Sequence, residues 1–507
     1  MAVKSKWAVL AVLASALALI SLDNTIVNVA LPTLQEELRA STAQLQWVVD
    51  AYSVLFAGTL LLAGSLGDRF GRRRMLIVGL LIFILASFSA VFAQDANALT
   101  LSRALMGIGG AFIMPSTLSI LVQVFTDRTE RARAIGIWAA VAGVGVALGP
   151  ILGGFLLEHF SWHSIFWVNP PVAASVLVAT LLLVPESRDP AKPKLDPLGA
   201  ALSSLGVIAL VVTVIELPDS GLSALTVGAA AVAVVSLTAF VWWEKRAARP
   251  ILPMELFSSR LFSTSIITVG LVYFALMGAM FFLPQFLQLV QGMTPFESGI
   301  AILPGAGGLL VASLFSPGMA ERIGSRKTVV LGLTLVTLAM ASFALLRTDT
   351  SYLFIGIVLG TIGLGLGLTL PQATNGVLAA VPAERAGMGS AVNDAVGELG
   401  GSFGVAILGA TLSFAYRQNI EEAITAAGAA AQQLPTSALD AARESLAAAS
   451  IQAGQLPDGV GDVFRQVAGQ AFVSGMALAL LVGAGITGLG LLIAWRRFPV
   501  RVDPVEE

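Results

Sequence analysis

Carboxylate side chains stand in this sequence at positions where a hydrocarbon environment makes them costly. Asp23 follows an apolar run from Trp7 to Ile20, within a predicted helix over 7–30 that is long enough to span a bilayer. A charged side chain at the centre of such a helix costs about 2.5–3.5 kcal/mol on insertion scales, and carboxylates found there commonly bind protons or ions. We therefore expect Asp23 to bind and release a proton. The alternative is an aspartate at a helix end whose side chain extends to the outer membrane interface.

Asp394 and Glu398 form a second acidic group, and their spacing of i and i+4 puts both on one helix face. At 1.5 Å per residue they lie about 14 and 20 Å from the cytoplasmic end near Arg385. Two close carboxylates in a medium of low dielectric constant oppose each other's ionisation. The pair is predicted to be a proton site or a negative surface for a cationic ligand. A polar stripe along a water-filled cavity is the alternative.

Three charged residues belong to three different apolar runs: Asp23, Asp50 and Arg103. Each lies about 5–6 residues from the outer end of its predicted helix, so the three side chains are expected at a similar level. A cation beside a carboxylate favours its ionised form, while burial opposes it. An Asp23–Arg103 pair that forms and breaks would therefore release and rebind a proton. A static ion pair, or an Arg103 that caps backbone carbonyls, is the alternative, and Asp50 stays open between a ligand contact and an interfacial aspartate.

The composition identifies an integral membrane protein. Of the 507 residues, 56% are hydrophobic and 12% are charged, about half the charged share of soluble proteins. The net charge of −2 gives no reason to expect nucleic acid as a partner. The absence of cysteine excludes disulfides, thiolate metal sites and cysteine catalysis. No nucleophile–base pair or cluster of metal ligands predicts an enzyme, so neither a cofactor nor a metal is expected. The first apolar run lacks a clear cleavage site and is predicted to be retained.

Fourteen apolar runs are long enough to be membrane helices. They cover 7–30, 45–64, 75–93, 99–124, 133–157, 164–184, 198–217, 223–243, 262–286, 298–317, 327–346, 352–378, 386–414 and 470–495. Alternate loops divide the Lys and Arg residues 23 against 5, with Arg103 inside a helix. Because basic residues favour the cytoplasmic side, both termini are predicted to be cytoplasmic.

An internal repeat divides the chain into two halves. The stretch 67–74, Gly-Asp-Arg-Phe-Gly-Arg-Arg-Arg, is echoed by 320–327, Ala-Glu-Arg-Ile-Gly-Ser-Arg-Lys. Two six-helix bundles of equal orientation are the pattern of a transporter. The predicted domains are a first bundle over 1–190, an inserted helix pair over 191–250, and a second bundle over 251–507. The second bundle includes an outer loop over 417–466, for which a short amphipathic helix and a loose linker are both open.

The stretch from Gly145 to Gly154 is rich in small residues and needs no chemistry of its own. Small residues at these spacings let two helices approach closely, and Pro150 removes a backbone hydrogen bond. By the repeat offset, its counterpart is the stretch with Asp394 and Glu398. We therefore predict that the first half seals this position with an apolar contact while the second half handles charge there.

Five stretches together resemble the major facilitator superfamily. The stretch 64–73 resembles the cytoplasmic loop signature of the family, 103–111 its fourth-helix motif, and 145–154 its antiporter motif. The stretch 22–32 resembles the first-helix signature of the fourteen-spanner drug:proton antiporter branch, and 47–52 resembles the QacA-like multidrug exporters. The predicted tenth helix has no carboxylate, although some relatives carry one there.

The resemblance implies an all-α integral membrane protein with the major facilitator fold: two six-helix bundles plus an inserted two-helix hairpin. It implies that Asp68 and Arg72 stabilise the interface between the bundles and that Arg103 serves coupling. The residues expected in conformational change are Gly64, Asp68, Arg69, Gly71, Arg72, Gly145, Gly149, Pro150, Gly153 and Gly154. Those expected in proton coupling are Asp23, Arg103, Asp394 and Glu398.

The expected function is proton-coupled efflux of lipophilic, cationic drugs across the cell membrane by a monomer that alternates its access. The residues expected to bind substrate are Asp50, Tyr52, Asp394, Glu398, Tyr273, Met277 and Phe281. An exporter dedicated to one endogenous metabolite, peptide or lipid would share every motif. A sensor without transport activity and a membrane enzyme are the alternatives from other classes. The sequence leaves the substrate and the proton stoichiometry open.

Overall fold

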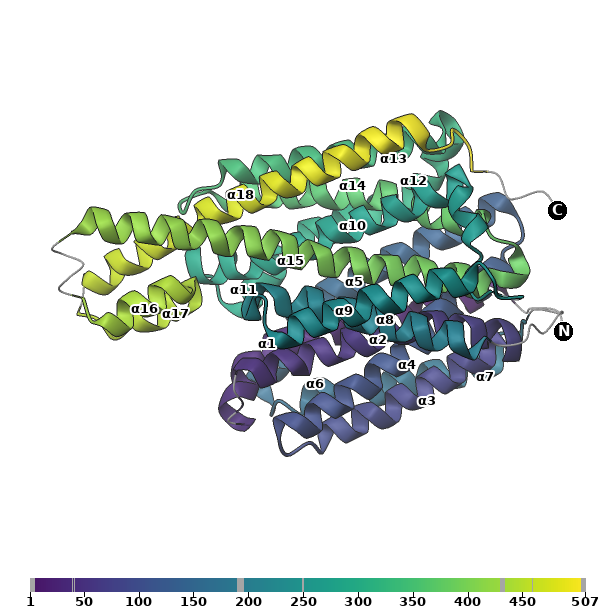
Figure 1. Ribbon diagram of the computed structural model, residues 1–507, viewed down its shortest axis with the longest axis horizontal. Helices are drawn as coiled ribbons and strands as arrows, with labels where there is room; N and C mark the ends of the chain where they lie inside the picture. Colours follow the sequence, from purple (N-terminus) through teal and green to yellow (C-terminus); the bar gives the residue numbers. More distant parts are fainter. Residues whose placement is uncertain are drawn as a thin grey trace.

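The structure is a computed structural model that describes residues 5–38, 40, 42–188, 196–248, 250–428, 434–457 and 459–502. This described part is helical and contains no strand (Figure 1). Fourteen segments within it are long and apolar enough to cross a membrane. The predicted all-α membrane class and the fourteen spans are therefore confirmed.

The first half contributes α1 (Lys6–Leu38), α2 (Thr42–Phe70), α3 (Arg72–Val91), α4 (Ala96–Val124), α5 (Arg128–His159), α6 (Ser164–Trp167) and α7 (Asn169–Leu183). The helix pair that follows is α8 (Pro197–Ser220) and α9 (Ala224–Glu244). The second half contributes η1 (Met254–Ser258), α10 (Arg260–Gln285), η2 (Phe286–Val290), α11 (Pro295–Ala301), α12 (Leu303–Ile323), α13 (Ser325–Ser342), η3 (Phe343–Leu345), α14 (Tyr352–Ala379), η4 (Ala383–Arg385), α15 (Ala386–Ala427), α16 (Thr436–Glu444), α17 (Leu446–Ala453) and α18 (Val460–Arg497).

Aspartates before the first turn define where several of these helices begin. The carboxylate of Asp95 accepts a hydrogen bond from the Ala98 amide at the start of α4. Asp127 does the same at the start of α5, and Asp196 at the start of α8. Each satisfies an amide that the helix itself leaves unpaired. These short polar caps end the connections and set the register of the apolar helices that follow.

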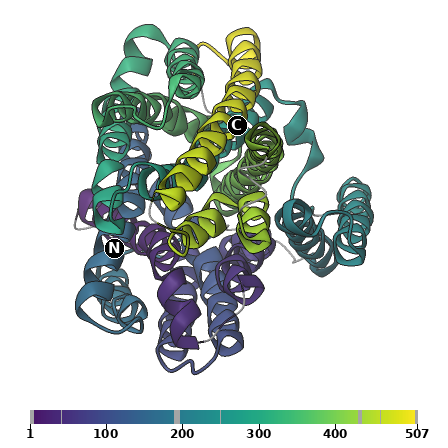
Figure 2. The ribbon, with the colours of Figure 1, turned by 90° about the vertical axis from the view of Figure 1, so that its left-hand side faces the viewer.

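The two halves repeat the same packing. In the first half α1 packs against α5, and α2 and α3 both pack against α4. In the second half α10 packs against α15, and α12 and α13 both pack against α14. Contacts of α5 with α12 and of α2 with α15 join the two bundles. The pair α8 and α9 stands beside the bundles, where α8 packs against α2 and α15 (Figure 2). The exact domain boundaries proposed from the sequence stay a prediction.

The repeat extends to single hydrogen bonds. Gly71 and Gly324 both have positive φ, at 118° and 91°, a conformation that favours glycine. The amide that follows each glycine donates at 2.9 Å to the chain beyond the last helix of its own bundle, to the Ser187 carbonyl in one case and to the Val500 carbonyl in the other. The sequence repeat therefore encodes a tight turn and the segment that packs onto it.

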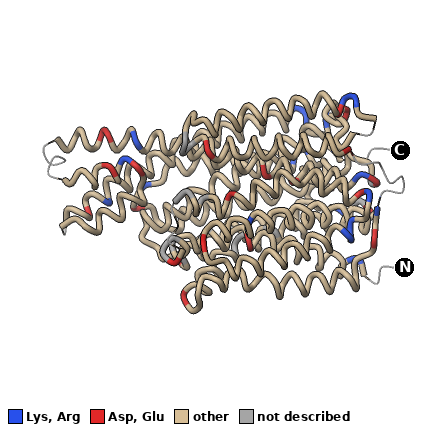
Figure 3. The backbone as a smooth tube through the Cα atoms, turned by 60° about the horizontal axis from the view of Figure 1, so that its bottom comes forward, with Lys and Arg blue, Asp and Glu red and all other residues tan. Residues whose placement is uncertain are grey.

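The ends of the molecule differ in charge and shape. Lys and Arg residues gather at the end where both chain termini lie (Figure 3); we call this the basic end. At the opposite end α15 and α18 extend beyond the other helices and carry α16 and α17 between them (Figure 1). At 1.5 Å per residue, the 42 residues of α15 span about 63 Å, more than a bilayer of about 45 Å. We call this projection the hairpin end.

The hairpin end decides between the two expectations for the predicted outer loop. Helices α15 and α18 extend into this segment, α16 and α17 lie between them, and Ser445 between α16 and α17 has extended backbone angles. Leu439 is partly buried and Ala442, Leu446 and Ala449 are buried, and the first two belong to α16 while the last two belong to α17. The segment is therefore helical, but it forms two short helices where the sequence analysis expected one.

Candidate functional site

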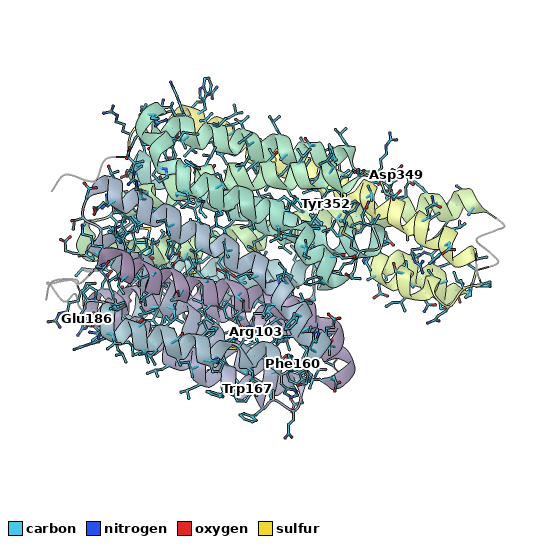
Figure 4. All side chains as sticks on the ribbon, turned by 180° about the vertical axis from the view of Figure 1, so that it is seen from behind. Arg103, Phe160, Trp167, Glu186, Asp349 and Tyr352 are labelled. Atoms are coloured by element: carbon cyan, nitrogen blue, oxygen red, sulfur yellow. The ribbon has the colours of Figure 1, made fainter. Side chains whose placement is uncertain are left out.

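The first acidic group is a buried ion pair in the core of the first bundle. The Arg103 guanidinium on α4 donates to Oδ2 of Asp23 on α1 across 2.6 Å. The side chain of Asp23 is 0% exposed and that of Arg103 is 1% exposed. Figure 4 shows Arg103 within the first bundle, away from Glu186 at the basic end. The predicted pairing is confirmed, and the alternative in which Asp23 reaches the membrane interface is wrong.

A third helix, α2, also contacts Arg103. The Arg103 Nε donates to the Val48 carbonyl on α2 across 3.3 Å, and the guanidinium lies 4.5 Å from the centre of the Tyr52 ring. A cation over an aromatic face is stabilised by the ring's quadrupole, and more strongly where water is excluded. Arg103 is therefore held by contacts to α1 and α2 that do not all depend on Asp23.

Asn169 is a member of this cluster that the sequence analysis did not single out. Its side-chain amide on α7 donates to Oδ1 of Asp23 across 2.6 Å, and Asn169 is 0% exposed. The signal was an amide inside a predicted membrane helix, directly before Pro170 and Pro171. Because a proline lacks an amide proton, this pair interrupts the helical hydrogen bonds, and α7 starts anew at Asn169.

The second acidic group lies on α15 and has no cation among its described contacts. Oδ1 of Asp394 accepts a hydrogen bond from Asn393 across 3.0 Å, and Oδ2 is buried with no partner in the described part of the chain. Glu398 is partly buried and is hydrogen-bonded to Ser53 on α2. Both carboxylates are close enough to Tyr273 on α10 to interact with it electrostatically. This site therefore faces the junction between the two bundles.

The side chains proposed to bind substrate follow α10 along its contact with α15. Tyr273 lies opposite Gly397 and Met277 opposite Gly401, where an added Cβ would come within 3.0 and 2.8 Å of them. Phe281 continues the row and is 43% exposed. On α2, Tyr52 is buried against Arg103 while Asp50 is only partly buried. Their substrate contacts stay a prediction.

Residues of the first-bundle loop motif bind the second bundle at the basic end. Oδ1 of Asp68 accepts from Arg72 across 2.8 Å and from the Gly387 amide across 2.9 Å, and its Oδ2 accepts from the Met388 amide across 3.0 Å. Arg72 also donates to the Glu384 carbonyl across 2.8 Å. A carboxylate at the first turn of α15 is favoured by the free amides and the dipole of that helix. We call these five residues the interbundle latch.

Other residues of the motif permit this approach. An added Cβ at Gly64 would lie 2.6 Å from the Gly387 carbonyl oxygen, so α2 and α15 can meet this closely only through glycine. Gly71 supplies the turn with positive φ, and the Arg69 guanidinium lies 5.2 Å from the centre of the Phe70 ring. The structure is thus closed between α2 and α15 at the basic end.

The glycine-rich stretch of α5 packs against α1 beside Asp23. An added Cβ would lie 2.7 Å from the Ser21 side chain at Gly145 and 2.9 Å from the Ile26 side chain at Gly153, and Gly149 meets Thr25 in the same row. Pro150 faces the other bundle, at Gly299. An added Cβ at Gly154 would meet no described atom within 4 Å, so the predicted close approach is wrong for this residue.

The predicted division between a sealing half and a charge-handling half is also wrong. On α15, Gly400 packs against the Gly270 backbone and Gly404 against the Phe274 backbone of α10, which is the counterpart of the contact between α5 and α1. The acids lie on another face of the same helix, since Glu398 contacts Ser53 of α2. Both bundles therefore contain a sealed glycine contact and a buried acid.

These features define a class: a helical membrane transporter built from two repeated bundles with buried acids at their core. Residues 13–405 match the family model of the Major Facilitator Superfamily, and the chain belongs to this family of transporters. The predicted family and fold are therefore confirmed.

Proteins similar to this chain include several named exporters. Multidrug efflux pump LfrA of Mycolicibacterium smegmatis is 39% identical over 455 residues, covering 86% of this chain and 90% of the relative. The tetracenomycin C resistance and export protein of Streptomyces glaucescens is 34% identical, over 80% of this chain and 76% of the relative. Methyl viologen resistance protein SmvA of Salmonella typhimurium is 33% identical, over 82% and 84%.

One solved structure supports the fold. The human organic anion transporter MFSD10 superposes with a TM-score of 0.62, covering 97% of this chain and 99% of that one. At 16% sequence identity this similarity concerns the fold alone.

Proposed function

We propose that this protein exports lipophilic, cationic drugs across the cell membrane in exchange for protons, by alternating access. The observation that carries the proposal is the buried Asp23–Arg103 pair. Ionisable side chains inside a membrane are costly, and those found there mostly have a function. Drug export is further supported by relatives named as multidrug and drug resistance proteins over four fifths of this chain.

In this mechanism a proton from outside neutralises Asp23 and removes its attraction for Arg103. If the two side chains separated without this proton, each would be left as an uncompensated buried charge, at a cost of about 3–5 kcal/mol. Arg103 retains the Val48 carbonyl and the Tyr52 ring as it separates from Asp23. At about 150 mV, each net positive charge moved inward supplies about 3.5 kcal/mol, so an exchange that moves one net charge can maintain a drug gradient of more than a hundredfold.

The second site receives the cationic drug. The uncompensated Oδ2 of Asp394 and the neighbouring Glu398 form a negative surface, and a bound cation offsets the cost of burying it. Tyr52 contacts Arg103 through its ring and is close enough to Glu398 to interact with it electrostatically, so it links the two acidic sites. This contact chain is the proposed route by which proton binding in one bundle changes drug binding in the other.

The basic end is proposed to be cytoplasmic, with both termini on that side, because basic residues favour the cytoplasmic face. The interbundle latch then closes the cytoplasmic side, and protons reach the acids from outside. A monomer contains both bundles and both acidic sites, so no second copy is needed for the cycle.

An exporter dedicated to one metabolite is the second candidate. It is favoured by the relative named for resistance to and export of tetracenomycin C. That protein is 34% identical to this chain, whereas the relative named as a multidrug efflux pump is 39% identical.

Efflux from proteoliposomes tests the proposal. Purified protein in vesicles with an imposed pH gradient is expected to move ethidium, methyl viologen and other unrelated cations, and to stop when nigericin collapses that gradient. Detergent-solubilised protein is expected to release protons when such a cation is added. Transport at the same rate with and without the pH gradient, or an absence of proton release, would refute proton coupling. Transport of a single compound only would favour the dedicated exporter.

A further inference from the structure

The polar contacts of Asp23 extend beyond its cation. Oδ2 is paired with Arg103, while Oδ1 accepts from the side-chain amide of Asn169 across 2.6 Å. The carbonyl oxygen of that amide, Oδ1 of Asn169, is buried and has no partner in the described part of the chain. A buried acceptor left unused is rare in proteins and needs an explanation. The Asn169 amide thus donates a hydrogen bond to Asp23 through Nδ2, while its acceptor Oδ1 is available for a second hydrogen bond.

The chain around Asn169 fixes where this amide stands. Val168 has helical backbone angles, and Pro170 and Pro171 occupy the first positions of α7. Because each proline ring restricts φ to about −65°, the start of α7 is held stiffly. Helix α7 packs against α1 and α3. The backbone of Asn169 therefore stays in place while the terminal torsion of its side chain, which is broad and roughly two-fold, can still turn.

A side-chain amide suits a carboxyl group that changes its protonation state. An ionised carboxylate accepts hydrogen bonds only, whereas a protonated one must also donate its O–H. In the first state Nδ2 of Asn169 donates to Asp23. After a half-turn of the amide, Oδ1 of Asn169 accepts from the protonated Asp23. The proton comes from the outer solution and stays on Asp23, so no bond of Asn169 is made or broken except hydrogen bonds.

We propose that Asn169 is the positioning residue of the proton site, satisfying Asp23 in both of its protonation states so that Arg103 can leave. The inference rests on the proposed function, because it assigns Asn169 to the proton step. A neutral group fits this role since it neither competes with Arg103 for the carboxylate nor adds a second charge.

The remaining surroundings of Asp23 leave this task to Asn169. The titratable and charged groups that face Asp23 are Arg103 from α4 and Tyr52 from α2, and Glu398 of α15 acts on the same tyrosine. Helix α5 presents glycines there, with Gly145 opposite Ser21. Arg103 has no acceptor, the glycines of α5 have no side chain to offer one, and the Tyr52 hydroxyl lies at Gly110 of α4, 2.6 Å from an added Cβ there.

The test compares Asn169→Leu, Asn169→Gln and Thr180→Val. Thr180 is the matched control, because it lies on the same helix, is 0% exposed and has a hydroxyl with no partner among the described residues. Purified proteins are reconstituted, and ethidium-driven proton exchange is recorded from pH 5 to pH 9. Ethidium binding is measured separately at one pH.

Asn169→Leu is expected to slow exchange about tenfold to a hundredfold, the effect of one lost hydrogen bond to a charged group. The pH of half-maximal exchange is expected to move upward by about one unit, because the charge-assisted bond to the ionised form is the stronger one. Ethidium affinity is expected to change less than threefold. Asn169→Gln, which keeps the amide, is expected to recover part of the rate, and Thr180→Val to match the wild type.

An unchanged pH profile in Asn169→Leu would overturn the proposal, as would an equal loss in Thr180→Val, which would show that α7 needs packing rather than this amide. If Asn169→Leu does not fold, Asn169→Ala replaces it, since the smaller side chain leaves room for water. Wild-type protein without drug-driven proton exchange would instead refute the proposed function itself. The infrared carbonyl band of protonated Asp23, assigned by its loss in Asp23→Asn, gives a second readout and is expected to shift in Asn169→Leu.

Discussion

The two bundles bury their acids in different ways. Asp23 in the first bundle has a cation on one oxygen and an amide on the other, both at 2.6 Å. Asp394 in the second bundle has one amide partner at 3.0 Å, and its other oxygen has none in the described chain. A compensated charge is stable until a proton arrives, whereas an uncompensated one attracts a proton or a cation. We therefore expect the acid of the first bundle to stay ionised until it is protonated, and the acid of the second bundle to bind a proton or a cation.

The interface between the bundles is also asymmetric. The latch joins Asp68 and Arg72 to the first turn of α15. At the repeat positions the second bundle has Glu321, which is exposed, and Ser325, which carries no charge. The repeat therefore preserves the turn, through Gly71 and Gly324, while only one copy carries the buried acid–base pair. The two halves thus share this turn, but only the first half has an ion pair at it.

The largest expected effect follows from removing the compensated acid. Asp23→Asn leaves the buried Arg103 without its anion and is expected to abolish proton-driven efflux and to lower the free energy of unfolding by about 3–5 kcal/mol. Thermal unfolding in detergent measures the stability. Adding Arg103→Met is expected to restore the stability but not the transport. An unaltered unfolding midpoint in Asp23→Asn would contradict the compensation on which the comparison of the acids depends.

Closing of the latch is expected to fail in Gly64→Val. The new side chain would overlap the Gly387 carbonyl, which lies 2.6 Å from an added Cβ, so α2 and α15 must separate at the basic end. Efflux is expected to fall more than tenfold. Because the chain contains no cysteine, a cysteine pair introduced on these two helices allows spin-label distances to be measured without background.

The matched control for this glycine is Gly154→Val. An added Cβ there meets no described atom within 4 Å, so the variant is expected to transport normally. A Gly64→Val protein with unchanged spin-label distances would contradict the close approach of the two helices.

A smaller effect is expected at the uncompensated acid. Asp394→Asn removes a negative charge that no described cation balances, so the stability is expected to stay within about 1 kcal/mol of the wild type or to rise. Binding of cationic drugs is expected to weaken about tenfold, while a neutral analogue is unaffected. Calorimetric titration measures both. A loss of stability as large as that of Asp23→Asn would erase the difference between the two sites.

The smallest effect is expected at the hairpin end. Arg443 pairs with Glu421 at 2.7 Å and with Asp440 at 3.2 Å, yet all three side chains are exposed. Hydrogen bonds from its guanidinium to these acids raise the pKa of Arg443, so it stays charged at every working pH. Exposed ion pairs contribute little because water screens them. Arg443→Ala is expected to leave the unfolding midpoint and efflux unchanged. A marked loss of efflux would instead assign the hairpin end a part in transport.

Much of the fold could be predicted because bilayer thickness sets the length of a membrane helix. The fourteen spans, the repeat and the depth of Asp23 and Arg103 all follow from hydropathy and a rise of 1.5 Å per residue. Helix ends beyond the membrane could not be predicted this way. The predicted span 386–414 continues to Ala427, since outside the hydrocarbon a helix no longer needs apolar side chains.

What the sequence by itself determined was the set of apolar segments, their order and the level of the charged side chains, because these depend on composition and on distance along one helix. The tertiary structure decided which way each side chain turns and what it meets. Asn169 reaches Asp23 across 146 residues, and Asp68 binds amides of Gly387 and Met388. The sequence shows an amide at Asn169 but not its partner, because rotation about a helix axis is set by packing. Backbone amides are the same in every residue but proline, so the partners of Asp68 leave no local sequence signal.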